Sequence, residues 1–377
     1  MRWDIFCTVI DNYGDIGVAW RLARQLQHEH GFTVRLWVDD LSSFARIAPG
    51  LDATAAAQHC DSVDVRLWTP DFPADTDAAD VVIEAFGCRL PDAYLDAMAA
   101  RPTPPAWINL EYLSAEDWVE GCHALSSPHP RLPLTKHFFF PGFTPATGGL
   151  LCEDELFAAR DAWQAADAAA WRAARGIPPR RAGELTVSLF AYENPAATSL
   201  LRHWATQPRP VTCLVPQGKV LADVATALGT PTLAPGDVHD HGALRVVVLP
   251  MSDQDGYDRL LWSCDLNFVR GEDSFVRAQW AARPLVWHIY PQDDDAHRVK
   301  LDAFLARYSA GLEPAAAAAL AAVHHAWNHG SDMAAAWQNM EAWLPQLARH
   351  ACIWPQKMRQ QGHLVERLVQ FIENRVQ

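Results

Sequence analysis

Two successive alternations of buried strands and amphipathic helices constrain the fold of this chain most strongly. In the first, an apolar strand at Trp3–Ile10 is followed by a glycine-bearing loop, a helix from about Val18 to Glu29, and a strand at Thr33–Val38. Strand, helix and strand in this order form a βαβ unit, and such units build parallel sheets. The same alternation begins again after Gly183. We therefore expect an α/β chain with two doubly wound, Rossmann-like sheets.

The other strands and helices are predicted from short apolar runs bounded by turn residues. Strands are expected in the first half at Val63–Trp68, Asp80–Phe86, Ala106–Leu110 and Lys136–Pro141. Strands are expected in the second half at Leu185–Phe190, Pro210–Val215, Leu244–Leu249, Asp265–Val269 and Pro284–Ile289. Helices between the second set are expected near Ala196–Ala205, Gly218–Leu228, Asp255–Trp262 and Phe275–Ala282.

The length of the chain favours two domains, because 377 residues that are 50% hydrophobic can bury at least two cores. An alanine-rich helix is predicted over Glu153–Arg175, and Gly176–Gly183 is the best candidate for a linker. Beyond Asp295 the pattern is helical and ends in a helix over Gln356–Gln377. The predicted domains are residues 1–180, completed by the C-terminal helix 356–377, and residues 181–355.

Composition excludes several classes of protein. A formal net charge of −14 argues against a nucleic-acid binder, which needs basic groups to displace counterions. The eight cysteines include no C-x-x-C pair and no zinc spacing. Acidic residues interrupt any signal-peptide pattern, and no apolar run approaches the ~20 residues that span a bilayer. We expect a cytoplasmic protein that binds neither nucleic acid nor membrane.

One segment of the second half, Leu266–Trp280, has the pattern of an anion-binding site. It predicts a strand, a turn at Gly271, and a helix whose first turn holds Asp273 and Ser274. The amino end of a helix favours an anion, and Arg270 adds a fork of donors suited to phosphate. These residues are therefore candidates for binding a diphosphate. In the alternative, Asp273 and Ser274 only cap the helix, and Arg270 pairs with Glu272 on the surface.

Three more candidates follow strands of the second half. Phe190 and Tyr192 end the first of these strands, where two rings could enclose a planar base; the alternative is that they belong to the core. Gln254 follows another strand and could recognise the edge of a base, or it could belong to a capped turn into the next helix. In open α/β sheets, ligands bind at such carboxyl ends.

Asp11 and Asp15 lie at the end of the first strand of the chain, in the loop Asp11–Gly17. As a pair at a carboxyl edge they are candidates for acid–base chemistry. The alternatives are an Asx turn for Asp11 and a helix cap for Asp15. With the two predicted crevices facing each other, a transfer reaction would have its acceptor at one and its donor at the other.

The sequence offers little support for a metal site. The adjacent pair His324-His325 diverges by about 100° on a helix, so the two rings cannot chelate from one face. The run Asp293–Asp295 is more typical of a solvated helix start. We expect no metal and no cofactor.

Several motifs together resemble one known family. They are Ile10–Gly17 followed by Trp20–Leu26, Leu36–Asp40, Trp107–Leu113, Phe138–Phe143 and Arg270–Ser274. These stretches, along nearly the whole chain, are similar to the bacterial protein-arginine rhamnosyltransferases that modify elongation factor P, the EarP family. The resemblance implies a GT-B glycosyltransferase with dTDP-β-L-rhamnose as donor, inversion at the sugar carbon and no metal. It also implies that the first domain takes the acceptor protein and the second takes the nucleotide sugar.

Within that expectation, Asp15 is our choice for the catalytic base, with Asp11 orienting the acceptor guanidinium or supporting Asp15. Glu272 could be a second support, or could contact the donor. The predicted nucleotide-sugar site comprises Phe190, Tyr192, Gln254, Arg270, Gly271, Asp273 and Ser274. Two alternatives to this function are a GT-B enzyme with another acceptor and a non-catalytic nucleotide-binding module.

Overall fold

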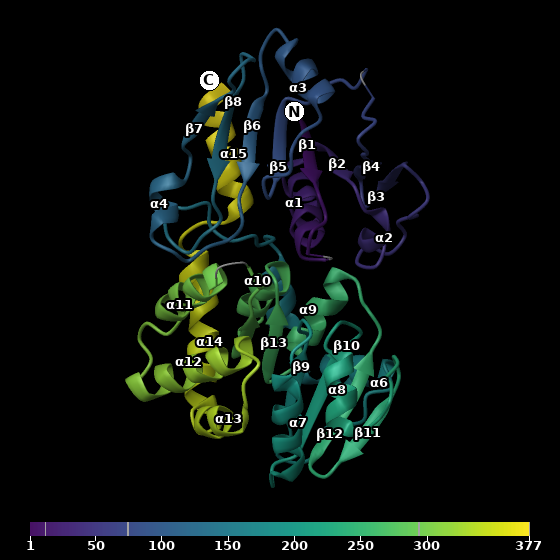
Figure 1. Ribbon diagram of the computed structural model, residues 1–377, viewed down its shortest axis with the longest axis vertical. Helices are drawn as coiled ribbons and strands as arrows, with labels where there is room; N and C mark the ends of the chain where they lie inside the picture. Colours follow the sequence, from purple (N-terminus) through teal and green to yellow (C-terminus); the bar gives the residue numbers. More distant parts are fainter. Residues whose placement is uncertain (12, 74, 293–294, 377) are drawn as a thin grey trace. The chain divides into compact units, whose positions relative to one another are not determined.

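The chain forms two compact units (Figure 1). The computed structural model describes residues 1–11, 13–73, 75–292 and 295–376. The first unit comprises Met1–Asp154 and Met358–Gln377, and the second comprises Glu155–Lys357. The chain therefore leaves the first unit earlier than the predicted boundary at residue 180, and it returns to that unit near its end.

The described part of the first unit contains an eight-stranded sheet in the order β3-β4-β2-β1-β5-β6-β8-β7. The strands are β1 Arg2–Cys7, β2 Thr33–Val38, β3 Ala57–Cys60, β4 Val63–Leu67, β5 Val81–Ala85, β6 Ala106–Leu110, β7 Ser126–Pro128 and β8 Thr135–Phe139. Neighbouring strands are parallel except for the edge strands β3 and β7, which run antiparallel to β4 and β8. The strand order reverses between β1 and β5, which makes their carboxyl ends the expected ligand position of this sheet.

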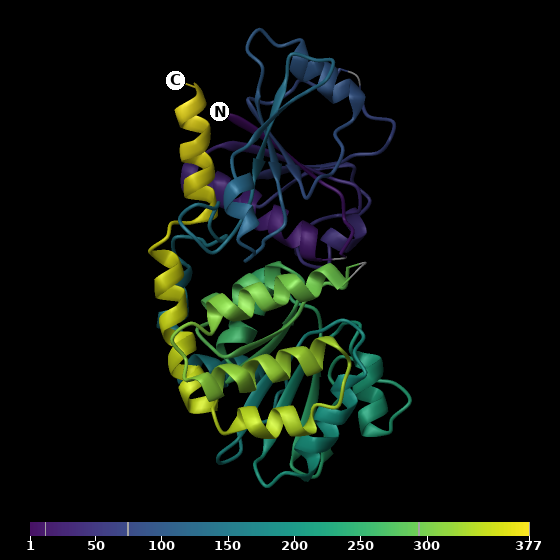
Figure 2. The same cartoon turned by 60° about the vertical axis from the view of Figure 1, so that its left-hand side comes forward.

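The helices of the first unit are α1 Gly14–His30, α2 Leu41–Phe44, α3 Asp92–Ala99, α4 Trp118–Cys122 and α15 Leu364–Val376. α1 begins four residues earlier than predicted and buries Ile16, Leu22 and Leu26 completely. Its acidic first turn and its left-handed Gly31 at the C-cap suit the ends of a helix. α15 lies beside the sheet of the first unit (Figure 2), where Phe371 contacts Phe139 of β8 with ring centroids 5.8 Å apart.

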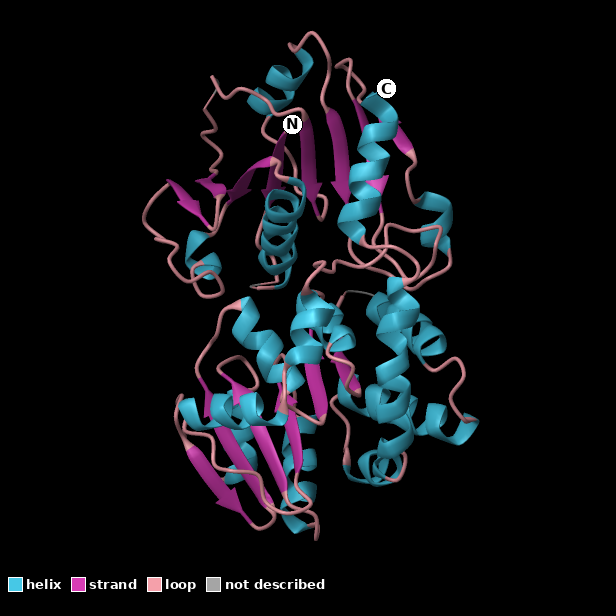
Figure 3. Ribbon diagram, turned by 180° about the vertical axis from the view of Figure 1, so that it is seen from behind, coloured by secondary structure: helices cyan, strands magenta, loops and turns pink. Residues whose placement is uncertain are grey.

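The described part of the second unit contains a six-stranded sheet in the order β11-β12-β10-β9-β13-β14, seen as arrows in Figure 3. The strands are β9 Leu185–Leu189, β10 Val211–Pro216, β11 Val238–His241, β12 Leu244–Leu249, β13 Leu266–Arg270 and β14 Leu285–His288. Only β11 is antiparallel to its neighbour. The order reverses between β9 and β13, so the carboxyl ends of these two strands are the corresponding position here.

The remaining helices belong to the second unit, apart from the last two residues of α14, Met358 and Arg359. They are α5 Leu156–Ala162, α6 Ala165–Ala174, α7 Ala196–Thr206, α8 Leu221–Leu228, α9 Gln254–Trp262, α10 Asp273–Trp280, α11 Ala296–Tyr308, α12 Pro314–Asn328, α13 Ala334–Glu341 and α14 Leu344–Arg359. Among the described residues, no helix is both long enough and apolar enough to cross a lipid bilayer.

The single alanine-rich helix predicted over Glu153–Arg175 is wrong, because two helices occupy this segment. The first helix, α5, ends at Ala162, and Trp163 follows it. The indole nitrogen of Trp163 donates to Ser263 Oγ at 3.3 Å, and its ring packs on Trp262. A new helix then begins, and Asp167 accepts a hydrogen bond from the backbone of Gln164 at 2.9 Å. These contacts attach the segment to the second unit.

The position of the first boundary follows from apolar packing. Trp171 of α6 and Ile177 after it belong to one buried cluster with Leu214, Val247 and Leu249, which lie on strands of the second sheet. Residues 155–180 therefore contribute to the core of the second unit.

The continuous helix predicted over Gln356–Gln377 is also wrong, because α14 ends at Arg359 and α15 begins at Leu364. Between them Gly362 has φ of 85°, a left-handed conformation that favours glycine. The backbone nitrogen of Leu364 then donates to the carbonyl of Leu150 at 2.9 Å, which ties the start of α15 to the first unit.

Candidate active site

In the first unit, Asp11 and Asp15 follow β1 and Phe86 follows β5, the two strands between which the order reverses. Asp15 is in the first turn of α1 and is only 2% exposed. It is not the N-cap, because that position belongs to Tyr13. The predicted pair of carboxylates therefore lies at the carboxyl edge of this sheet.

Within the described part of the chain, three donors hold the Asp15 carboxylate. The backbone nitrogens of Ile10 and Asp11 both donate to Oδ2 at 2.8 Å, and the hydroxyl of Tyr112 donates to Oδ1 at 3.1 Å. Each carboxylate oxygen has two lone pairs. Oδ2 is thus fully engaged, whereas Oδ1 has one acceptor position that no described residue fills beyond its bond with Tyr112. This arrangement fixes the direction in which the carboxylate can accept another donor.

Tyr112 was not among the predicted site residues. It is in the segment after β6, and its ring stacks on Phe86 with centroids 4.5 Å apart and planes at 19°. Phe86 itself has φ of 58°, an uncommon backbone conformation for a bulky residue. Two signals in the sequence pointed to Tyr112. It follows a predicted strand, and the carboxyl ends of neighbouring parallel strands meet at one edge. It also lies within Trp107–Leu113, one of the stretches on which the family resemblance depends.

Asp11 lies over the start of α1. Its backbone carbonyl accepts from Gly14 at 2.7 Å, and a Cβ on Gly14 would stand 2.7 Å from Asp11 Oδ2. Glycine at position 14 therefore permits the close approach of this carboxylate.

The pKa of the buried Cys7 thiol is raised, chiefly by burial and next by the negative charge of Asp15.

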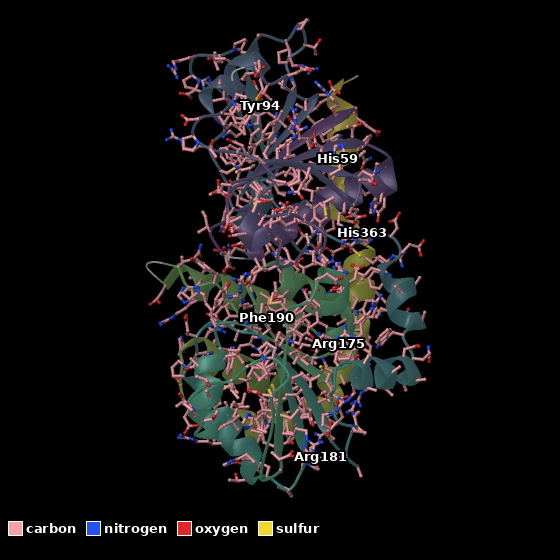
Figure 4. All side chains as sticks on the ribbon, turned by 90° about the vertical axis from the view of Figure 1, so that its right-hand side faces the viewer. His59, Tyr94, Arg175, Arg181, Phe190 and His363 are labelled. Atoms are coloured by element: carbon pink, nitrogen blue, oxygen red, sulfur yellow. The ribbon has the colours of Figure 1, made fainter. Side chains whose placement is uncertain are left out.

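In the second unit, Phe190 and Tyr192 follow β9, and Arg270 ends β13. The Arg270 guanidinium lies 4.7 Å from the ring centroid of Phe190 and 4.6 Å from that of Tyr192. Figure 4 shows Phe190 at the opposite end of β9 from Arg181, which precedes the strand. The guanidinium carbon thus lies over both aromatic rings, in the arrangement of a cation–π contact.

Arg270 is only 5% exposed, so it does not lie on the surface as the alternative required. Glu272 is the N-cap residue of α10, and its carbonyl accepts from Val276 at 3.0 Å. Its side chain is half-buried and makes no cap bond. Glu272 is therefore at the start of α10, two residues after Arg270 in sequence.

The turn before α10 is held by Gly271 and Ser274. The Ser274 hydroxyl donates to the carbonyl of Arg270 and accepts from the Arg270 nitrogen at 3.1 Å. Gly271 has φ of 60°, and its carbonyl accepts from the indole nitrogen of Trp287 at 2.7 Å. Ser274 thus acts on the backbone of the turn, which sets the position of Arg270.

Gln254 and Asp273 are the remaining predicted members of the nucleotide-sugar site. The side-chain nitrogen of Gln254 lies 3.4 Å from Asp273 Oδ2, which joins the starts of α9 and α10. The neighbouring Asp253 caps α9 by accepting from Gly256 at 2.7 Å. The capped turn considered as an alternative is therefore present, and Gln254 is the first residue of the capped helix.

His288 is a further polar residue of this group that sequence reasoning missed. It ends β14, packs edge-on against Tyr192 with centroids 5.2 Å apart, and is 6% exposed. Burial, reinforced by the positive charge of Arg270, lowers its pKa to about 3. The imidazole is therefore neutral at pH 7 and adds no charge to the site.

The structure thus brings the predicted residues into two groups, one in each unit. Asp11 and Asp15 are together in the first. Phe190, Tyr192 and Arg270 are together in the second, next to the linked pair of Gln254 and Asp273.

No group of three or more potential metal ligands occurs among the described residues. Asp293 and Asp294 of the acidic run lie outside those residues, and Asp295 forms an ion pair with Arg298 at 3.2 Å.

Comparison with known proteins gives concordant matches. The sequence model of a family described as EarP, elongation factor P (EF-P) rhamnosyltransferase, matches residues 3–373. A protein-arginine rhamnosyltransferase of Pseudomonas putida is 55% identical over 373 residues, which cover 99% of this chain and 98% of the relative. One from Neisseria meningitidis is 38% identical over 360 residues, with 93% and 90% coverage.

A solved structure is also similar over its whole length. It is described as the structural basis for EarP-mediated arginine glycosylation of translation elongation factor EF-P. Its chain is 42% identical, each chain is covered to 99%, and the TM-score is 0.72.

Proposed function

The chain belongs to the EarP family of EF-P rhamnosyltransferases, and from this membership we propose how its two sheets divide the reaction. It is a protein-arginine rhamnosyltransferase with the two Rossmann-like domains and C-terminal helices of a GT-B glycosyltransferase. It moves a rhamnosyl group to an arginine side chain of EF-P. Because the acceptor is a translation factor, we place the reaction in the cytoplasm.

The second unit binds the donor in this proposal, and the donor is dTDP-β-L-rhamnose. The observation that supports it is the Arg270 guanidinium, buried against Phe190 and Tyr192 at the amino end of α10. The rings hold the guanidinium in place, and its planar fork of N–H donors suits two phosphate oxygens. Negative charge builds on the diphosphate as the sugar leaves, and each well-placed donor is worth roughly 3–4 kcal/mol to the transition state.

The first unit binds the acceptor arginine, and Asp15 is the base. A guanidinium is a poor nucleophile, because it is protonated at neutral pH and its electron pairs are delocalised. A carboxylate that holds one N–H localises the charge on the other nitrogens and takes up the proton. Asp15 suits this role, since Oδ1 has an acceptor position in a direction fixed by Tyr112 and two backbone amides.

The bond changes balance in one displacement. The arginine nitrogen bonds to C1 of rhamnose from the face opposite the diphosphate, and the C1–O bond breaks with its electron pair leaving on dTDP. The proton from that nitrogen passes to Asp15. The configuration at C1 therefore inverts, from β in the donor to α in the product. Asp11 orients the guanidinium, and Glu272 supports either the acceptor or the donor sugar.

The direct test is to mix the purified chain with dTDP-β-L-rhamnose and EF-P and to weigh EF-P. We expect a gain of one deoxyhexosyl group, localised to an arginine by fragmentation. NMR of the anomeric carbon should give the α configuration. A β product would contradict the single displacement, and an unmodified EF-P would contradict the function.

We expect the acceptor to be a folded domain. The guanidinium must be held against Asp15 to within a fraction of an ångström, and free arginine has little remote surface whose binding energy could achieve this. EF-P or its acceptor domain should therefore be modified with kcat/KM at least ~10³-fold above that of an unstructured peptide with the same arginine. Comparable values would mean that recognition depends on local sequence.

We also expect transfer to be independent of divalent metal. In this proposal Arg270 and the amino end of α10 stabilise the negative charge of the leaving diphosphate, which a divalent metal stabilises in other enzymes. The rate in excess EDTA should equal the rate without it. A loss of activity that Mg²⁺ or Mn²⁺ restores would contradict this prediction and would direct attention to the acidic run Asp293–Asp295.

A further inference from the structure

A cavity of 520 Å³ lies within the second unit, away from the residues assigned to the donor. Its volume is in the range typical of small-molecule sites, about 300–1,000 Å³. Asp265, on its wall, immediately precedes β13, whereas Arg270 ends that strand. The cavity is thus at the amino ends of the parallel strands, at the opposite edge of the sheet from the donor group.

The hollow follows from the sequence of α6. Ala165, Ala168, Ala169 and Ala173 line it, at spacings that place them along one side of the helix. The helix is held in place by Trp171, which is buried in the core cluster described above. Short side chains on an anchored helix leave a space that larger residues would fill. The atoms that line an empty space lose dispersion contacts, so close packing of the core favours filling the cavity and does not account for its presence.

A buried arginine in the wall has an unused donor. Arg172 is 4% exposed, and its Nη atoms contact the carbonyl of Pro178 at 2.7 Å and the Glu184 carboxylate at 3.5 Å. Its Nε has no hydrogen-bond partner within the described chain. A buried donor without a partner costs about 1–3 kcal/mol. Burial accordingly lowers the pKa of Arg172.

Two more arginines line the same cavity. Arg180 pairs with Asp265, the only carboxylate of the lining as described. Arg283 is exposed, and the structure gives it neither a hydrogen bond nor an ion pair with any described residue. Burial and Asp265 raise the pKa of Cys264, while all three arginines act to lower it. Their positive charges therefore converge on this wall, in a chain whose net charge is −14.

Most of the remaining lining is apolar, with Gln164 and Ser263 as its polar members. Trp163 and Trp262 are half-buried and pack edge-to-face with ring centroids 6.1 Å apart, and Ile177 lies beside them in the lining. Aromatic walls next to guanidinium groups suit a ligand with a ring at one end and an anion at the other.

We propose that this cavity binds a small organic anion with an apolar ring, such as an aromatic carboxylate or sulfonate, at a site separate from the donor site. The ring lies against Trp163 and Trp262. The anion pairs with the exposed Arg283, and the positive charge of the buried Arg172 behind the wall adds to the attraction. The proposal is independent of the transferase function, because none of these residues belongs to either group of candidate active-site residues.

The test uses 1-naphthalenesulfonate as the probe, with the full chain and calorimetry in the presence and absence of saturating dTDP. We expect one probe molecule per chain, with an affinity that dTDP leaves unchanged. The neutral isostere 1-naphthalenemethanol should bind at least ~10-fold more weakly, because it lacks the charge that the arginines meet. Absence of probe binding, or displacement of the probe by dTDP, would overturn the proposal.

Three variants locate the probe. Ala168→Phe fills the cavity and Arg283→Gln removes an exposed charge, so each should weaken probe binding at least ~5-fold while dTDP affinity stays unchanged. Arg202→Gln, an exposed arginine of α7 outside the cavity, is the matched control and should bind the probe normally. Thermal unfolding verifies that each variant is folded. If folded Arg283→Gln binds as tightly as the control, the site is elsewhere.

Discussion

Replacement of Asp15 by asparagine is expected to lower kcat for rhamnose transfer by at least ~10³-fold, within the range of effects for loss of a general base. The amide cannot accept the proton that leaves the arginine nitrogen, and it lacks the charge that holds the guanidinium. Affinity for dTDP should be unchanged, because Asp15 belongs to the first unit and the donor residues belong to the second. Kinetics with EF-P and calorimetry with dTDP measure the two quantities.

A structural role for Asp15 makes a different prediction. Since Asp15 accepts from Ile10 and Asp11, the substitution could also loosen the loop before α1. Asp40→Asn is the matched control, because Asp40 follows β2 at the same sheet edge and accepts from the nitrogens of Ser42 and Ser43. Hydrogen bonds from the hydroxyls of both serines, with smaller contributions from these backbone bonds, lower the pKa of Asp40 to about 2. Its variant should lose stability but keep turnover. Near-normal turnover of Asp15→Asn would mean that Asp15 only holds the loop before α1 in place and is not the base.

Replacement of Arg270 by alanine is expected to weaken dTDP binding by about 10²-fold, equal to the loss of one or two charge-assisted bonds of about 1.5–3 kcal/mol each. Turnover should fall as well, because the leaving diphosphate loses a donor. Arg270→Lys should be intermediate, since it keeps the charge but not the planar fork. Tyr192→Ala should have the smaller effect on affinity, about 10-fold, because it removes a ring contact and not a charge. Calorimetry with dTDP measures the affinity of these three variants and ranks them.

Arg259→Ala is the control for this series, because Arg259 is an exposed arginine of α9 in the same unit. Arg270 is buried, so its variants must be compared at equal folded fractions, checked by thermal unfolding. Unchanged dTDP affinity in both Arg270→Ala and Tyr192→Ala would place the nucleotide elsewhere in the protein.

Much of the fold follows from local patterns that can be read one segment at a time. β2, β6 and β12 have the predicted bounds, because each is a mostly apolar run with clear ends. The edge strands β3, β7 and β11 were not predicted. Their residues are mostly exposed, so they form strands through pairing with a neighbour and not through an apolar pattern of their own.

The candidate site divides in the same way. Asp11, Asp15 and Arg270 could be chosen from sequence, since each follows or ends a predicted strand and carries a group suited to chemistry. The bond from Tyr112 to Asp15 joins residues 97 positions apart, and only the pairing of β1, β5 and β6 brings them together. The contact of Phe190 and Tyr192 with the Arg270 guanidinium was missed for the same reason, since it depends on β9 and β13 being neighbours.

The return of the chain to the first unit at Met358 has a consequence for synthesis on the ribosome. Residues 1–154 emerge first, yet the segment carrying Phe371 and Leu364, which packs on β8 and pairs with Leu150, is made last. At about 5–20 residues per second, making the second unit takes roughly 10–40 s. During this interval the nascent first unit exposes the apolar surface that α15 later covers, so a chaperone that binds such surfaces has its longest opportunity there.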